Sequence, residues 1–350
     1  MKPTQAKQCA LNVLEGNNTP FFLGGTGIGK SAVVEEIVNE LSGDLEVIRG
    51  EVNPNKNQFG FVDFRLSLYE SVDLGGLPYI DDNNVQKRAF LGNLPQSGEG
   101  VLFFDEYPQS SQSVQAIVGQ LIYEKRLGEY VFPSDGWKII CAGNRASDRA
   151  GSFKLPSHVI GRCSVIDFEH DTDDWLAWAG SSDVHQDVAG YISYRQDALN
   201  VFDPKVVSPQ PSPRSWTRLS DTLKTDPPKD LYQLLFATDI GEEQAIEFST
   251  FLSLKDDVPN LKAILTGKKV DVPDKAGLCY ATICAILSVM KDAKDSVIHD
   301  YFSNALKYIE RMPTPEFGIL FVRQIANARA EVKESKTFVD FKVANQDLEI

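Results

Sequence analysis

The chain has 350 residues, of which 42% are hydrophobic and 24% are charged, an ordinary composition for a globular protein of about two domains. Its net charge of −14 argues against an extended phosphate-binding face for DNA or RNA, although a small basic pore lining stays compatible with it. The first residues, Met1–Gln5, are too polar for a signal peptide, and the longest apolar stretch, Cys279–Met290, is too short to cross a bilayer. We therefore expect a cytoplasmic protein with neither a membrane nor a nucleic-acid partner.

The cysteines and histidines indicate neither a disulfide framework nor a metal site. None of the five cysteines forms a C-x-x-C pair, and their odd number leaves one unmatched, which is typical of free thiols in a reducing compartment. The four histidines lack metal-ligand spacing, so we expect them to be structural. The cysteines are Cys9, Cys141, Cys163, Cys279 and Cys284.

A glycine-rich segment after a short apolar run is the central motif. Phe21–Leu23 predicts a buried strand, and Gly24 and Gly29 occupy the glycine positions of G-x-x-x-x-G-K-[ST], the phosphate-binding P-loop. Glycines let backbone N–H groups converge on an anion, and the following helix adds the positive end of its dipole. Lys30 would reach the β- and γ-phosphates, and Ser31 would hold Mg²⁺. The predicted nucleotide-binding residues are Gly24, Gly25, Thr26, Gly27, Ile28, Gly29, Lys30 and Ser31.

A continuous apolar run, Gly100–Phe104, ends in two acids, Asp105 and Glu106. An apolar run in which polar residues do not alternate with apolar ones is typical of a strand buried on both faces of a parallel sheet. Ligands of such sheets bind at the carboxyl ends of the strands, which is where the two acids fall. After a P-loop, this is the Walker B arrangement. We expect Asp105 to join the Mg²⁺ shell and Glu106 to polarise the water that attacks the γ-phosphate.

Further strands and two hairpins complete the predicted α/β region. Tyr79–Phe90 predicts one hairpin, and Tyr130–Ile140 predicts a second one across Pro133–Gly136. The helix between them is expected to end in a turn with Lys125 and Arg126 followed by Gly128. Asn144 ends the strand from Trp137 and is suited to holding the attacking water or the γ-phosphate. The other expected strands are Val47–Ile48, Phe61–Leu66 and Cys163–Phe168.

Strand patterns end at Asp171, and the remainder of the chain predicts helices. Ser212-Pro213-Arg214 is a well-formed helix start, with Ser212 as the N-cap and proline at the first position, so Arg214 lies at a helix end that could face a nucleotide. The predicted fold class is α/β: a P-loop NTPase parallel sheet flanked by helices, followed by an all-α lid and a helical C-terminal extension. The expected domains are 1–170, 171–265 and 266–350.

Four stretches of the chain are similar to the MoxR group of the AAA+ ATPases. They are Arg65–Ser67 with Asp73–Pro78, Leu102–Glu106, Arg126–Leu127–Gly128 through Ala142–Arg145, and Ser212–Trp216. The resemblance covers Ala10 to roughly Lys224 and implies that Asn144 is the sensor 1 residue, Arg162 the arginine finger and Arg214 the sensor 2 residue. It also implies a helix 2 insertion around Asp81–Asn84 and a pre-sensor 1 insertion around Pro133–Gly136. Rings of this family are typically hexamers that remodel proteins, often with a von Willebrand factor A domain partner.

The finger region departs from the family pattern. The usual acid and aromatic residue beside the finger arginine are here Gly161 and Cys163. Arg162 is the best candidate, and Arg145 and Arg149 are its competitors, each of which could instead form a salt bridge on the loop after sensor 1.

The sequence therefore predicts a MoxR-type AAA+ ATPase that uses ATP and Mg²⁺ in a homo-oligomeric ring to remodel a protein client. The predicted catalytic residues are Glu106, Asn144 and Arg162, with Ser31 and Asp105 as metal ligands and Arg214 as a further nucleotide contact. Two alternatives stay open. One is a nucleic-acid motor of the restriction-GTPase type, using GTP or ATP, and the other is a nucleotide-gated scaffold with little turnover.

Overall fold

The computed structural model describes residues 1–90, 92–145 and 157–345. The chain divides into two compact units, Met1–His170 and Asp171–Ile350. Within the described ranges, no helix combines the length and the apolar character needed to cross a membrane.

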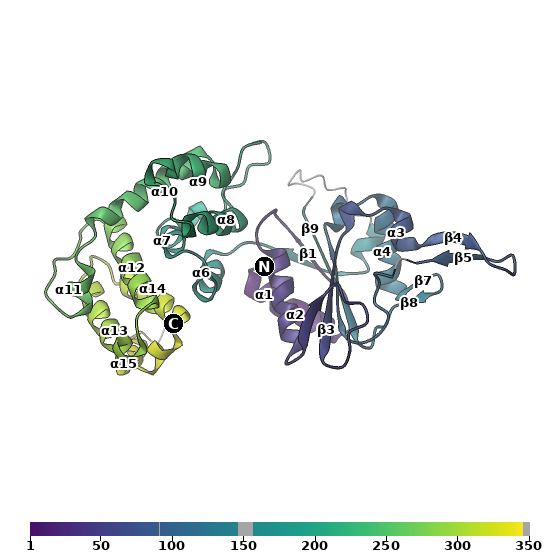
Figure 1. Cartoon of the computed structure of the whole chain (residues 1–350), viewed down its shortest axis with the longest axis horizontal. Helices are drawn as coiled ribbons and strands as arrows, with labels where there is room; N and C mark the ends of the chain where they lie inside the picture. Colours follow the sequence, from purple (N-terminus) through teal and green to yellow (C-terminus); the bar gives the residue numbers. More distant parts are fainter. Residues whose placement is uncertain (91, 146–156, 346–350) are drawn as a thin grey trace. The chain divides into compact units, whose positions relative to one another are not determined.

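The first unit is built on a six-stranded sheet in which every pair of neighbours is parallel, in the order β10-β1-β9-β6-β3-β2 (Figure 1). Because all strands run in one direction, their carboxyl ends meet at one edge, the place where parallel sheets bind ligands. Strands β1, β9, β6 and β3 are consecutive neighbours, so the residues that follow them gather at this edge. The strands are β1 (Pro20–Gly24), β2 (Glu46–Arg49), β3 (Gln58–Arg65), β6 (Gly100–Asp105), β9 (Trp137–Gly143) and β10 (Ser164–Phe168).

Helices cover both faces of this sheet (Figure 1). On one face, α1 (Pro3–Glu15) and α2 (Lys30–Ser42) pack against side chains such as Phe22 and Phe103. On the other face, α3 (Ser71–Gly75) and α4 (Gln112–Glu124) pack against Phe21 and Phe104. Successive strand residues point to opposite faces, so a strand covered on both sides needs apolar residues at every position. This is why the uninterrupted runs in β1 and β6 form central strands.

Two small hairpins extend from the first unit. As predicted, β4 (Leu77–Ile80) pairs with β5 (Gln86–Ala89). The second predicted hairpin is wrong, because β8 (Tyr130–Val131) pairs with β7 (Arg126–Leu127) instead of with the segment after Trp137.

The physical reason lies at the end of α4 and in the sheet. Lys125 has a φ of 53° and ends the helix earlier than predicted, which frees Arg126 for a strand. Trp137 begins β9, whose apolar residues are buried between neighbours β1 and β6 and cannot also serve a surface hairpin. The turn at Gly128–Glu129 therefore replaces the one expected at Pro133–Gly136.

The described part of the second unit is helical and has two apolar cores. Trp216, Tyr191 and Phe248 are central in one core, and Phe302 and Phe321 in the other. The helices are α6 (Thr172–Ser181), α7 (Gln186–Tyr194), α8 (Pro213–Lys224), α9 (Tyr232–Ile240), α10 (Glu242–Ser253), α11 (Leu261–Leu265), α12 (Ala276–Lys291), α13 (Asp295–Ile309), α14 (Glu316–Ala328) and α15 (Lys336–Ala344). The predicted fold class, a P-loop NTPase sheet flanked by helices and followed by a helical region, is confirmed.

One helix contributes to both cores of the second unit. From α12, Ala281 and Cys284 pack in the first core, whereas Ile283 and Ile286 pack in the second. The predicted boundary between a lid and an extension at residue 265 stays a prediction.

Candidate nucleotide-binding site

The P-loop turn joins β1 to α2 at the carboxyl edge of the sheet. Gly24 closes β1 so near to β10 that a Cβ atom there would lie 2.4 Å from the carbonyl oxygen of Phe168. Gly29 precedes α2 with a φ of 100°, a left-handed conformation that favours glycine, and a Cβ at this position would meet no described atom within 4 Å. The turn therefore needs glycine at both ends, and the backbone before α2 is open to an approaching anion.

Lys30 anchors this turn with its ammonium group. Although only 8% of the residue is exposed, Nζ donates hydrogen bonds to the carbonyl oxygens of Gly24 (2.9 Å) and Gly25 (2.6 Å) and to Oδ1 of Asn144 (2.9 Å). Asn144 directly follows β9, the neighbour of β1. A buried cation needs partners of this kind. The amide oxygen of Asn144 faces the lysine, which leaves its N–H groups as donors.

Ser31 and Asp105 place a hydroxyl and a carboxylate together. The Ser31 hydroxyl donates a hydrogen bond of 3.1 Å to Oδ2 of Asp105, while Oδ1 of the same carboxylate accepts one of 2.7 Å from the backbone N–H of Glu106. In the described residues, no cluster of three histidine, cysteine or acidic side chains could hold a metal by itself. Mg²⁺ is usually held by one or two carboxylates, with phosphate oxygens and water completing its shell. The hydroxyl–carboxylate pair beside the P-loop fits that pattern.

Glu106 lies directly after β6 with a φ of 56°, which is uncommon for a residue with a side chain. Its carboxylate accepts a hydrogen bond from the hydroxyl of Ser67. The parallel register pairs Arg65 with Asp105, so Ser67 follows its strand at the same edge at which Glu106 follows β6. Sequence reasoning missed this contact, since only the pairing of β3 with β6 brings the two residues together.

A further acid lies on β3 near this edge. Partial loss of hydration, and then the negative charge of Asp105, raise the pKa of the Asp63 carboxyl. In the register of the sheet, Asp63 pairs with Phe103, two residues before Asp105. Asp63 and Asp105 therefore lie on the same face of the sheet, the face covered by α2.

The structure does not bring Arg162 or its competitor Arg145 into this cluster. Arg162 follows the short helix α5 (Ser157–Ile160), and its guanidinium carbon lies 5.2 Å from the ring centre of Tyr123 on α4. Arg214 is an exposed residue in the first turn of α8 and belongs to the second unit. Of the competitors, Arg145 forms an ion pair with Asp167, and residue 149 lies outside the described residues.

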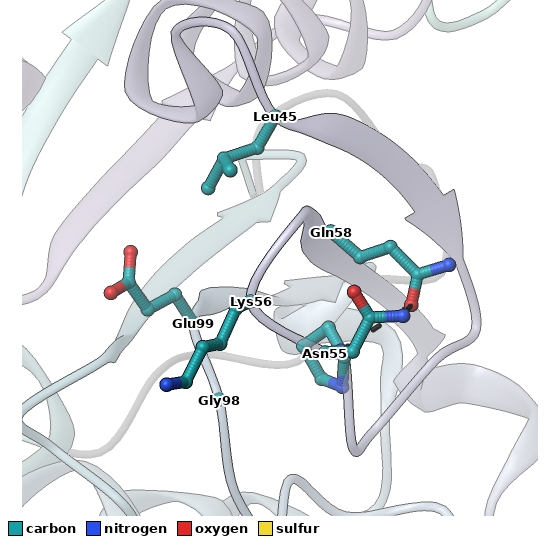
Figure 2. Close-up of a pocket in the computed structure, with 7 residues that line it drawn as sticks. Leu45, Asn55, Lys56, Gln58, Gly98 and Glu99 are labelled. Carbon is teal, nitrogen blue, oxygen red and sulfur yellow. Dashed lines mark hydrogen bonds between the residues drawn. The ribbon is translucent and has the colours of Figure 1, made fainter.

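A separate pocket of about 370 Å³ lies at the opposite edge of the sheet (Figure 2). Its lining includes Leu45, Gln58 and Glu99, which precede or begin β2, β3 and β6 at their amino ends. In its lining, the side-chain amide of Asn55 donates a hydrogen bond of 2.7 Å to the amide oxygen of Gln58 (Figure 2). None of the predicted site residues lines this pocket, so it is distinct from the candidate nucleotide site.

Comparisons with known proteins give low similarity. The sequence matches no protein-family model, and no curated protein matches it. The fold is similar to that of a point mutant of RuvB from Thermotoga maritima (16% identity, 75% of both chains covered, TM-score 0.39). It is also similar to the RuvB Holliday junction branch migration motor of the same organism (15% identity, 75% of this chain and 74% of that chain, TM-score 0.34). NtrX from Brucella abortus is similar over 93% of this chain and 67% of its own (11% identity, TM-score 0.33). Similarity at this level carries no conclusion about activity, substrate or assembly.

Proposed function

We propose that this chain is an AAA+ ATPase of the MoxR type, which hydrolyses ATP with Mg²⁺ in a homo-oligomeric ring and remodels a protein client. One observation carries the proposal of ATP hydrolysis. Lys30 and Ser31 of the P-loop contact Asn144 and Asp105 directly, at the carboxyl ends of three neighbouring strands.

The proposed chemistry is phosphoryl transfer to water, in which positioning and charge neutralisation supply most of the rate. Lys30 would exchange its carbonyl partners for oxygens of the β- and γ-phosphates. Ser31 and Asp105 would hold Mg²⁺, which when bound neutralises charge on the phosphates. Glu106 would accept a hydrogen bond from the attacking water and polarise it. The side-chain N–H groups of Asn144 would orient that water or a γ-phosphate oxygen.

The contact between Ser67 and Glu106 gives this proposal a specific feature. The Ser67 hydroxyl fixes one carboxylate oxygen of Glu106, so the other oxygen is available for water. A carboxylate on a strained backbone position that is also held by a neighbour is positioned more narrowly than a free glutamate.

The ring and the client rest on the resemblance to the MoxR group and on the location of Arg162. Since the guanidinium of Arg162 lies along α4 instead of among the P-loop contacts, we propose that it completes the site of a neighbouring subunit. Arg214 is proposed to contact the nucleotide from the lid, and a protein with a von Willebrand factor A domain is the proposed kind of partner.

The proposal is tested by measuring turnover of ATP and of GTP, with and without DNA, by the assembled protein. Turnover of ATP that requires Mg²⁺ and is indifferent to DNA supports it. Binding without turnover would overturn the proposal of an ATPase. A Glu106→Gln variant loaded with ATP, used as bait, then tests for the protein client by identifying the proteins that co-purify with it.

A further inference from the structure

The guanidinium of Arg162 lies along one turn of α4. Its carbon atom is 5.2 Å from the ring centre of Tyr123, and its terminal nitrogen lies 3.4 Å from the position that a Cβ on Gly119 would occupy. Residues 119 and 123 are neighbours on the same helix face. The guanidinium therefore lies over the turn of α4 that carries Gly119 and Tyr123.

The backbone of Arg162 is fixed on both sides. Its N–H donates a hydrogen bond of 3.0 Å to the carbonyl of Val159, a residue that is fully buried. On the other side, the thiol of Cys163 is hydrogen-bonded to Cys141 within β9, an interaction that lowers the pKa of Cys163. From this backbone position, the Arg162 side chain lies against Tyr123 and Gly119 of α4.

Tyr123 is a large aromatic residue on the exposed face of α4. It is 70% exposed, and within the described residues its hydroxyl has no hydrogen-bond partner. A large aromatic ring that is mostly in water gains little from burial, whereas a guanidinium over its face gains a cation–π attraction. The ring of Tyr123 makes this cation–π contact with the guanidinium of Arg162.

We infer that Tyr123 is a positioning residue that holds the Arg162 guanidinium extended along α4, in the orientation from which it reaches the nucleotide of a neighbouring subunit. This inference rests on the proposed function, since it needs Arg162 to act between subunits. Each subunit would use its own Tyr123 to position the Arg162 that it supplies to its neighbour. The Tyr123 of the subunit that receives the arginine would have no effect on that active site.

A subunit-mixing experiment with the full-length chain tests this directly. Lys30→Ala subunits still supply Arg162 to a neighbouring subunit, but their own P-loop does not bind ATP productively. Arg162→Ala subunits keep an intact P-loop but supply no arginine to the neighbour. Mixed under exchange, they should recover ATP turnover. Tyr123→Ala is then added either to the Lys30→Ala donor or to the Arg162→Ala receiver. We expect the recovered kcat to fall about two- to fivefold in the first mixture, the size that a cation–π contact at an exposed site supports, and to be unchanged in the second.

Two variants control the result. Tyr123→Phe in the donor keeps the ring and should restore the recovered kcat, because the hydroxyl takes no part in the contact. Glu124→Ala changes the neighbouring exposed residue of α4 and should leave the recovered kcat unaltered. The KM for ATP should stay the same in all mixtures, since the receiving P-loop is never altered.

Three outcomes contradict the account at different levels. The positioning role of Tyr123 is overturned if Tyr123→Ala in the donor subunit leaves turnover unchanged. It is also overturned if Tyr123→Ala lowers turnover equally in the donor and in the receiver subunit. Neither outcome contradicts the action of Arg162 between subunits. If the mixture of Lys30→Ala and Arg162→Ala subunits recovers no ATP turnover although the two co-assemble, Arg162 does not act between subunits. The inference about Tyr123 then fails as well. In that last case the Mg²⁺-dependent turnover of the unmixed wild-type protein still decides whether the chain is an ATPase.

Discussion

The hydroxyl of Ser67 donates a hydrogen bond to the carboxylate of Glu106. The two residues are 39 positions apart in the chain and meet because β3 and β6 pair in parallel, so that each residue follows its strand at the same edge. This contact connects the proposed water-polarising carboxylate to the segment that leads into α3.

Replacing Ser67 by alanine should lower kcat about tenfold without changing the affinity for ATP. The substitution removes a hydrogen bond to a charged group, and such bonds contribute about 1.5–3 kcal/mol, part of which is lost as orientation of the carboxylate. Steady-state hydrolysis together with equilibrium ATP binding separates the two quantities. Ser67→Thr keeps the hydroxyl and should retain the rate. A kcat that stays at the wild-type value in Ser67→Ala would show that the contact does not position Glu106.

Lys30→Ala should weaken ATP binding by about 100-fold or more. Hydrogen bonds from a cation to phosphate are the strong, charge-assisted kind, and 100-fold corresponds to about 2.7 kcal/mol. Isothermal titration calorimetry with a non-hydrolysed ATP analogue measures the change directly. The thermal unfolding of the variant is the control, because the mutation also removes the partner of Asn144. Binding of the analogue within about threefold of the wild-type value would contradict the assignment of the P-loop lysine.

The dependence of ATP hydrolysis on Mg²⁺ concentration should change when either Ser31 or Asp105 is substituted. Chelation of Mg²⁺ should abolish turnover. Ser31→Ala and Asp105→Asn should each raise the Mg²⁺ concentration that gives half of the maximal rate, since each removes an oxygen from the proposed shell. The Mg²⁺ titration is run at fixed, saturating ATP. If neither variant shifts its midpoint, the metal is held elsewhere.

Gly24→Ala should destabilise the first unit, whereas Gly25→Ala should not. A Cβ on Gly24 would lie 2.4 Å from the carbonyl oxygen of Phe168, but the nearest atom to one on Gly25 is a methyl group of Ile28 at 3.6 Å, an ordinary contact. Overpacking of this kind costs about 1–3 kcal/mol. Urea denaturation of the two variants side by side measures it, and an equal midpoint for both would show that β1 and β10 separate easily.

The P-loop, the two acids after the apolar run and Asn144 could be predicted from the sequence as candidate site residues, because the carboxyl ends of parallel strands meet at one edge of a sheet. The contacts that depend on the exact register or on helix packing could not. The P-loop is a contiguous segment, and the apolar run before Asp105 predicts a central strand by itself. The contact of Ser67 with Glu106 depends on register, and that of Arg162 with Tyr123 depends on how α5 packs on α4. No pattern within either segment encodes such contacts.

The errors in the fold have a similar cause. Tyr130–Val131 and Trp137–Gly143 are both apolar and close in sequence, which favours a hairpin between them. Trp137–Gly143 instead forms the buried strand between β1 and β6, and Tyr130–Val131 pairs with β7. Which of these pairings forms depends on tertiary packing and not on the local sequence.

The most direct test of the central claim compares the wild-type protein with Glu106→Gln for both ATP binding and ATP hydrolysis. The substitution is nearly isosteric and leaves Lys30, Ser31 and Asp105 in place, so ATP should bind with wild-type affinity. Hydrolysis should fall by about two to four orders of magnitude, because the group that polarises water is lost. Hydrolysis by Glu106→Gln at close to the wild-type rate would contradict the assignment of Glu106 and, with it, the proposed mechanism of ATP hydrolysis at this edge of the sheet.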